Sequence, residues 1–292
     1  MLLRYPGGKS RGEVATKLLE VIEARLDEGF DKFCEPFFGG GGITFALLKH
    51  DQSRVAKGLS RRINHLIIND LDPSIECLWT AVVKNHEELI EQVRGCALSK
   101  KGFHDAKDRI KAADSTALDT LIVNRLSHGG RGVRGGLQGG ENQTGEYKIG
   151  CRWSVPYLCK GIQIAHDLLT APGISLWWNS CRKESYEHFL TESFADYLLY
   201  LDPPYFKHGN ELYQHSFGED DHKVLSGELI KHYRRNKNGP GWVLSYDNDH
   251  RIRWLYEHSF TKIKTSNIGN IKVRKKELIF TSFKPADKKE HA

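Results

Sequence analysis

Short clusters of apolar residues along the chain predict an α/β fold. Apolar residues spaced four apart predict an amphipathic helix over 12–26. Apolar runs predict buried strands at Lys32–Glu35 and His65–Ile68, joined through a glycine turn and a helix over 43–49. The polar stretch Asp51–Arg62 is expected to be a loop. A strand, a glycine turn, a helix, a second strand and then an acid form the opening of a doubly wound sheet.

The strand pattern returns in the second half of the chain. Apolar runs predict strands at 174–178, 197–201 and 242–245. Residues 260–265 and 277–281 predict a closing antiparallel pair. The expected fold class is therefore α/β, with a Rossmann-like doubly wound sheet.

A polar, mostly helical region interrupts this pattern over 74–158. Within it, 124–143 holds seven glycines with arginines between them, which predicts a mobile loop or a hairpin. We expect a catalytic domain over 1–73 and 159–283, with the region 74–158 inserted as a separate domain. The charged end, 284–292, is predicted to be a disordered tail.

The composition is that of a folded protein with a basic surface. Of 292 residues, 39% are hydrophobic, and the net charge of +6 favours polyanionic partners such as nucleic acid. No apolar run is long enough for a signal peptide or a membrane span, so a cytoplasmic protein is expected. None of the six cysteines forms a CxxC pair and no histidines have metal-ligand spacing, so we expect free thiols and no metal.

The glycine turn after the first strand suits a nucleoside cofactor. Glycines let a ligand approach the backbone, and the run from Gly39 does not match the GxGxxG pattern of dehydrogenases. Glu35, just before the turn, offers a carboxylate to an ammonium group. Asp70, after the next strand, is placed to accept both ribose hydroxyls. These features favour S-adenosylmethionine over a dinucleotide, with a plain structural turn as the alternative.

The tetrapeptide Asp202-Pro203-Pro204-Tyr205 follows a predicted buried strand. The prolines fix the backbone and lack N–H groups, so the strand end offers acceptors only. The Asp202 carboxylate and the Pro203 carbonyl match the two hydrogens of an exocyclic amino group, and Tyr205 offers a ring for stacking. Such a site would position a base amine for direct methyl transfer, whereas a rigid turn is the alternative interpretation.

Taken together, these motifs resemble those of the Dam-type, α-class DNA adenine methyltransferases, in the same order over nearly the whole chain. The similar segments are Arg4–Lys9, Cys34–Gly42, Asn69–Asp72, Leu201–Tyr205, Tyr213–Phe217 and Val273–Leu278. The resemblance implies an S-adenosylmethionine-dependent enzyme that methylates the 6-amino group of an adenine flipped out of duplex DNA. The catalytic residues would be Asp202, Pro203, Pro204, Tyr205 and Lys9. The cofactor-binding residues would be Tyr5, Gly8, Lys9, Glu35, Pro36, Phe37, Gly39, Gly41, Asp70 and Asp202.

By the same resemblance, the inserted domain would recognise the target DNA. Asn124 and Arg125 match the start of a DNA-contacting hairpin, but the following Leu126–Gly130 departs from the family pattern, so no recognition sequence is predicted. Arg131 and Arg134 are candidates to read guanines, with phosphate contact as an equal alternative. Lys275 is a further DNA-binding candidate, and the basic run around it is equally compatible with a solvated surface.

Two other functions are compatible with parts of the pattern. Methyltransferases acting on RNA or on a protein amide usually carry Asn where this chain has Asp202, and often lack an arginine-rich insertion. A DNA-binding homologue without catalysis would not be expected to keep Lys9, Asp70 and the Asp202 motif. Double-stranded DNA is the expected partner and the expected state is a monomer or weak dimer, while the sequence does not indicate whether a restriction nuclease is also a partner.

Overall fold

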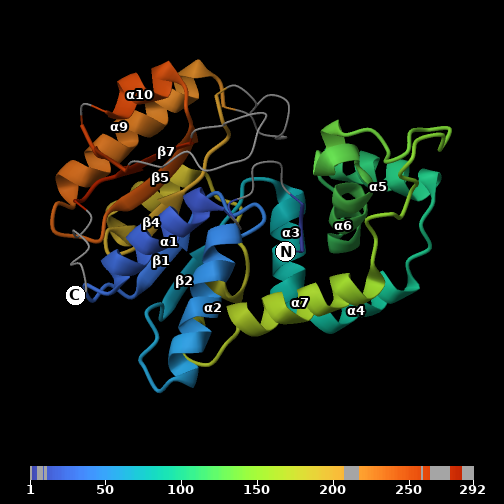
Figure 1. Cartoon of the computed structure of the whole chain (residues 1–292), viewed down its shortest axis with the longest axis horizontal. Helices are drawn as coiled ribbons and strands as arrows, with labels where there is room; N and C mark the ends of the chain where they lie inside the picture. Colours follow the sequence, from blue (N-terminus) through green and yellow to red (C-terminus); the bar gives the residue numbers. More distant parts are fainter. Residues whose placement is uncertain are drawn as a thin grey trace.

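A seven-stranded sheet forms the centre of the protein, in the order β3-β2-β1-β4-β5-β7-β6 (Figure 1). The computed structural model describes residues 2–4, 9, 12–206, 217–257, 259–263 and 277–284. The strands are β1 (Lys32–Glu35), β2 (His65–Ile68), β3 (Ser175–Leu176), β4 (Leu198–Leu201), β5 (Trp242–Asp247), β6 (Thr261–Ile263) and β7 (Glu277–Thr281). The first five are parallel, and β7 pairs antiparallel with both β5 and β6.

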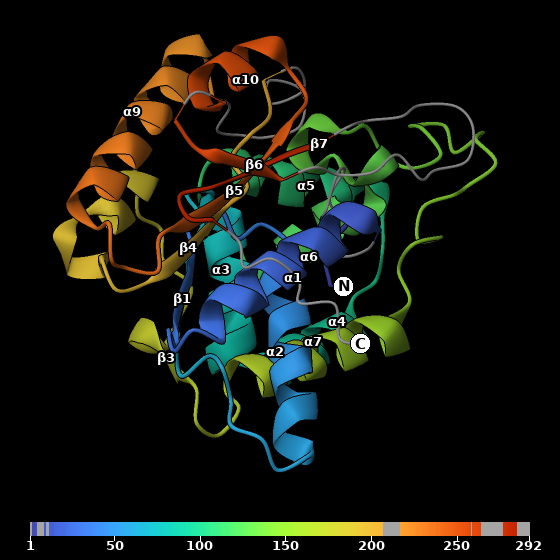
Figure 2. The same ribbon diagram turned by 60° about the vertical axis from the view of Figure 1, so that its left-hand side comes forward.

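Helices cover both faces of this sheet (Figures 1 and 2). They are α1 (Glu13–Leu26), α2 (Gly42–Ala56), α3 (Pro73–Lys84), α4 (His86–Gly95), α5 (Lys100–Lys111), α6 (Ala117–Leu126), α7 (Val155–Leu169), α9 (Glu219–Arg235) and α10 (His250–Tyr256). One apolar core joins α1, α2, α3 and α7 to one face, and a second core joins α9 and α10 to the other. The predicted doubly wound α/β sheet is confirmed.

Most of the predicted elements agree closely with the structure. The strands predicted at 32–35 and 65–68 are β1 and β2 with the same bounds. The first helix begins one residue later than predicted. The predicted closing pair corresponds to β6 and β7, which pair antiparallel. Residues 264–276, between these two strands, lie outside the described chain.

Two local predictions were wrong. The loop expected over Asp51–Arg62 begins only after Ala56, because Asp51 is buried and its carboxylate accepts the amide N–H groups of Arg62 and Ile63, at 3.0 and 2.9 Å. The strand expected over 174–178 is reduced to β3. At Trp178 the backbone turns into the left-handed region, with φ of 61°, so the aromatic residues leave the sheet.

The inserted region has a small core of its own. Residues of α5 and α6 pack around Phe103 and Ile122, away from the sheet, and Figure 1 shows these helices as a separate lobe. In contrast, α3 and α4 contribute to the main core beside the sheet. The exact domain boundaries therefore stay a prediction.

No described helix is long and apolar enough to cross a membrane.

The glycine- and arginine-rich segment folds back on itself as a hairpin-like turn. An isolated antiparallel bridge joins Ser127 to Leu137. The amide of His128 donates to the Gly136 carbonyl at 2.8 Å, and Leu137 is buried in the small core. The segment therefore contains short 3₁₀ turns closed by a single bridge and has no paired strands, and Leu137 anchors it to the small core.

Candidate active site

Three carboxylates of the predicted catalytic and cofactor residues lie at the carboxyl edge of the parallel strands. Asp202 directly follows β4, Glu35 ends β1, and Asp70 comes two residues after β2. Since β1 lies between β2 and β4, the three carboxylates occupy neighbouring strand ends. The connection direction changes between β1 and β4, which is where open α/β sheets bind their ligands.

Asp202 contacts the described chain through one of its two carboxylate oxygens. Its Oδ1 accepts the Ser245 hydroxyl at 2.9 Å and the Lys9 ammonium at 3.3 Å. Ser245 also lies 3.0 Å from the Tyr200 hydroxyl, so a buried polar pair orients the carboxylate. Within the described chain no donor contacts Oδ2, and the side chain is 23% exposed.

Lys9 links the catalytic motif to the far side of the site. Its ammonium lies 3.3 Å from Asp202 and 3.3 Å from Glu277 at the start of β7, and it donates to the Tyr205 hydroxyl. The Lys9 side chain is only 5% exposed. A buried cation between two carboxylates offsets their mutual repulsion. Burial raises the pKa of Glu277 in spite of this lysine.

The remaining residues of the motif form one wall of the site. Pro203 and Pro204 are buried, whereas Tyr205 is half-buried. The Tyr205 ring lies 6.3 Å from that of Tyr246, and the Lys9 ammonium lies 4.6 Å from its centroid. The ring therefore has a fixed position with part of its surface accessible.

The glycine turn has a backbone that only glycine adopts easily. Gly39 and Gly41 have φ of 47° and 62°, in the left-handed region, and Gly41 is the N-cap of α2. A side chain at Gly41 would meet the Phe38 ring at 2.5 Å. The Trp79 indole N–H donates to the Gly39 carbonyl at 2.7 Å, which holds the turn in place.

Glu35 is a buried acid beneath this turn. It is 3% exposed, and it accepts hydrogen bonds from the Thr44 hydroxyl and, at 3.3 Å, from the Thr44 amide. Burial raises the pKa of Glu35 to about 8, and the neighbouring Asp202 carboxylate adds to this shift. A cation bound beside Glu35 would reverse the shift, so the residue suits an ammonium group.

Asp70 occupies the position expected of a ribose acceptor. Its Oδ2 accepts the Gly39 amide at 2.7 Å and its Oδ1 accepts the Asp72 amide at 3.0 Å, so each oxygen keeps a further lone pair. Burial raises the pKa of Asp70 to about 7. The adjacent Asn69 is buried and joins the turn to 182–184, because its amide donates to the Pro36 carbonyl at 2.9 Å and to the Glu184 carbonyl at 3.0 Å.

An aromatic cluster borders the glycine turn. The Phe37 ring lies 5.6 Å from that of Tyr186 and 5.9 Å from that of Phe217. Tyr186 and Phe217 also contact each other, at 5.8 Å. The cluster places a half-buried apolar surface next to the glycine turn, which is suited to a flat heterocyclic ring.

The predicted DNA-binding residues of the insertion fall into two groups. Asn124 and Arg125 are buried at the end of α6, where they contact the start of the chain. Arg131 and Arg134 are exposed on the hairpin-like turn, and neither makes an ion pair with another described residue. Only the second pair is accessible to an external polyanion in this structure.

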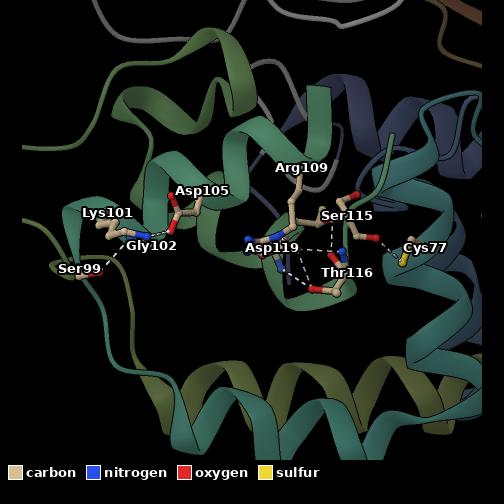
Figure 3. A network of polar contacts seen from close by, with 10 residues as sticks. Cys77, Ser99, Lys101, Gly102, Asp105, Arg109, Ser115, Thr116 and Asp119 are labelled. Carbon is tan, nitrogen blue, oxygen red and sulfur yellow. Dashed lines mark hydrogen bonds and ion pairs between the residues drawn. The ribbon is translucent and has the colours of Figure 1, made fainter. Parts of the chain in front are cut away.

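Polar contacts hold the helices of the insertion together, as Figure 3 shows. Arg109 of α5 donates to the Asp119 carboxylate at 2.9 Å, and Asp119 forms a capping box with Thr116 at the start of α6. The Cys77 thiol of α3 lies 3.5 Å from the Ser115 carbonyl. These contacts fix α5 and α6 relative to each other and to α3.

Three predicted site residues cannot be placed. Tyr5, Gly8 and Lys275 lie outside the described residues, and so does most of the segment Tyr213–Phe217. Their proposed roles stay predictions.

Comparison with known protein families gives one match, to the first part of the chain. A model of the D12 class N6 adenine-specific DNA methyltransferases matches residues 5–127. This match confirms the family resemblance. It includes the glycine turn, Asp70 and the first part of the insertion, whereas the Asp202 motif lies beyond it. No curated protein sequence matches the chain at a significant level.

The matched family indicates transfer of a methyl group to N6 of adenine in DNA.

The structure also shows residues that support the predicted site and that the sequence did not assign to it. Thr44, Ser245 and Glu277 contact Glu35, Asp202 and Lys9 respectively. Each is separated in sequence from its partner. Glu277 lies in Val273–Leu278, one of the segments that resemble the family, but its contact with Lys9 was not predicted. Ser245 also had a signal, because it ends a predicted strand that could neighbour the strand of Asp202.

Proposed function

We propose that this chain is a site-specific DNA methyltransferase that moves a methyl group from S-adenosylmethionine to the 6-amino group of adenine. The observation that carries the proposal is Asp202, whose Oδ1 is held by Ser245 and Lys9 while Oδ2 meets no donor in the described chain. An amino hydrogen of the target base would occupy that acceptor. The family match over residues 5–127 supports the same chemistry.

The residues at the glycine turn fit this cofactor. Glu35 offers a buried carboxylate for the methionine ammonium, and Asp70 offers one oxygen to each ribose hydroxyl. The rings of Phe37 and Tyr186 suit the cofactor's adenine. S-adenosylmethionine, when bound, supplies an electrophilic methyl group on a sulfonium.

The chain's own residues then position the nucleophile. The amino nitrogen of adenine is a weak nucleophile because its lone pair is delocalised into the ring. Hydrogen bonds to Asp202 Oδ2 and the Pro203 carbonyl would favour a pyramidal nitrogen and stabilise the positive charge that develops on it. The new nitrogen–carbon bond would form as the carbon–sulfur bond breaks, and the methylated nitrogen would then release one proton to solvent. Tyr205 stacks on the base and limits its rotation. Positioning of this kind supplies much of the rate enhancement, and no covalent enzyme intermediate is needed.

The target atom has to leave the duplex to reach this site. The 6-amino group is inaccessible to a side-chain pocket while its base is stacked, so the adenine flips out before transfer. Arg131 and Arg134 project from the insertion and would contact the surrounding DNA. The basic net charge of +6 favours the initial approach.

Product analysis tests the proposal directly. The protein is incubated with methyl-labelled S-adenosylmethionine and unmethylated duplex DNA, and the DNA is digested to nucleosides. We expect label in 6-methyladenine, and mapping of the labelled positions gives the recognition site. Parallel reactions with RNA and with protein extract cover the alternative substrates. Cofactor binding with label in RNA or protein only, or in no substrate, would refute the proposal.

Cofactor affinity is expected to rise with pH. Because the pKa of Glu35 is raised to about 8, the acid is mostly protonated at pH 6 and has to lose its proton to hold an ammonium. Affinity should therefore rise by up to about tenfold per pH unit between pH 6 and 7.5. Titration calorimetry in buffers of different ionisation enthalpy would also detect the released proton.

Substitution separates Glu35 from other titrating groups. Glu35→Gln should weaken binding and flatten the pH dependence, while Asp70 retains a smaller contribution because its pKa is raised to about 7. Glu87→Gln, an exposed site on α4, serves as the matched control and should change neither property. An unchanged pH slope in Glu35→Gln would exclude this residue as the ammonium partner.

Arg131 and Arg134 are expected to affect DNA recognition. If they read base edges, Arg131→Ala or Arg134→Ala should cost about 1–3 kcal/mol of discrimination at one position and leave cofactor affinity unchanged. If they contact phosphates, every DNA sequence should bind more weakly by a similar factor and the salt dependence should fall. Arg94→Ala, at an exposed site on α4, is the control. Unchanged binding and selectivity in both variants would remove the hairpin-like turn from the interface.

A further inference from the structure

The first residues of the chain are fastened to the inserted domain. We call Leu2–Arg4 the N-terminal strap. Both ribbon views place the start of the chain beside α6 (Figures 1 and 2). Leu2 and Leu3 are buried in the main core, so the strap also has an apolar anchor on the catalytic side.

Asn124 holds the strap through two hydrogen bonds to a single residue. Its Oδ1 accepts the Arg4 amide at 2.9 Å, and its Nδ2 donates to the Arg4 carbonyl, also at 2.9 Å. The side chain is 7% exposed. Both polar ends of the amide are thus committed to the backbone of the strap and not to solvent.

Two further residues of the insertion contact the same three-residue segment. The Arg125 guanidinium donates to the Leu2 carbonyl and lies 5.4 Å from the Tyr157 ring. Gly130 packs against the strap so closely that an added Cβ would lie 2.9 Å from the Arg4 carbonyl oxygen. Three positions of the insertion therefore converge on the strap.

The strap is joined by a short length of chain to the catalytic site. Only four residues separate Arg4 from Lys9, and five extended residues span at most about 18 Å. At the other end of this link, Lys9 lies between Asp202 and Glu277. The covalent connection therefore limits how far Lys9 can lie from the strap that the insertion holds.

We propose that Asn124, Arg125 and Gly130 are positioning residues, which hold the N-terminal strap and thereby set Lys9 against Asp202. This inference rests on the proposed function for its kinetic consequence, and it deepens that function by connecting the DNA-recognition insertion to the catalytic motif. It also gives Asn124 and Arg125 a role other than base reading, because their polar groups face the chain itself.

Chemical labelling of lysine tests the proposal without any need for enzyme activity. The full chain is treated briefly with an amine-acylating reagent, and the extent of labelling at Lys9 and at the exposed Lys57 is measured by mass spectrometry. In the wild type Lys9 should label much more slowly than Lys57. Asn124→Ala should raise the Lys9 rate by about tenfold, because two hydrogen bonds that hold the strap are lost.

Gly130→Ala provides a second variant that acts from another contact. Its new methyl group should push Arg4 away and raise Lys9 labelling in the same direction. The matched controls are Asn142→Ala, at an exposed asparagine, and Gly132→Ala, where φ is also positive at 57° but no atom lies within 4 Å of the added Cβ. Both controls should leave the Lys9 rate unchanged. Continued protection of Lys9 in both strap variants would overturn the proposal.

Kinetics then separate positioning from DNA reading. If Asn124 acts by holding the strap, Asn124→Ala should lower kcat while DNA affinity stays unchanged. The same substitution should cause no further loss of kcat in a Lys9→Ala variant. A loss of DNA affinity with unchanged Lys9 labelling would show instead that Asn124 contacts DNA. If the wild type methylates no DNA, the proposed function fails, and the labelling result still decides whether the strap positions Lys9.

Discussion

Asp202→Ala is expected to lower the rate of methyl transfer by at least about a thousandfold. Loss of one fixed hydrogen-bonding group at a reacting centre costs about 10²–10³ in kcat, and this group also orients the amine. The variant removes the acceptor at Oδ2 and the anchor that holds Lys9 at 3.3 Å. Single-turnover transfer of labelled methyl groups to duplex DNA measures this loss. Cofactor affinity, measured by calorimetry, should largely survive because Glu35 and Asp70 remain.

The fold is expected to tolerate this change. Lys9 keeps its ion pair with Glu277 at 3.3 Å, so the buried ammonium is not left without a counter-charge. Asp202→Asn retains one acceptor oxygen and should be less damaging than alanine, while Asp220→Ala on the surface of α9 serves as the control. Full activity in Asp202→Ala would exclude the mechanism proposed for the strand end.

The central sheet could be predicted because its strands are continuous apolar runs with distinct ends. The runs Lys32–Glu35 and His65–Ile68 gave the correct strand bounds, since a parallel strand buried on both faces admits few polar residues. The third strand was predicted too long because tryptophans are also common in strands. Their rings instead stack outside the sheet, where Trp177 and Trp178 lie 4.5 Å apart.

The candidate site was predictable where motifs carry the chemistry and unpredictable where tertiary contacts do. Glu35 ends one recognisable strand, Asp70 and Asp202 follow two others, and strand order brings all three to one edge. Glu277 meets Lys9 only because β7 inserts antiparallel beside β5, which no local pattern specifies. Likewise, the burial of Asn124 against Arg4 depends on how the insertion packs on the start of the chain.

Gly41→Ala is expected to reduce both stability and cofactor affinity. The added Cβ would lie 2.5 Å from the Phe38 ring and 2.7 Å from the Phe45 ring, and the backbone φ of 62° is unfavourable for alanine. Overpacking and backbone strain together should lower the free energy of unfolding by about 2–4 kcal/mol. Chemical denaturation measures this change. Any relief by movement of Phe38 would also displace the turn that contains Gly39, so cofactor affinity should fall.

Gly58→Ala separates the two causes. Gly58 also has a positive φ, of 77°, but nothing lies within 4 Å of the added Cβ, so this variant has the backbone strain without the clash. It should lose about 1 kcal/mol and keep its cofactor affinity. Equal losses in the two variants would mean that the aromatic rings yield to the methyl group. In that case the backbone conformation alone would account for glycine at position 41, and the close packing of Phe38 and Phe45 would not be needed to explain it.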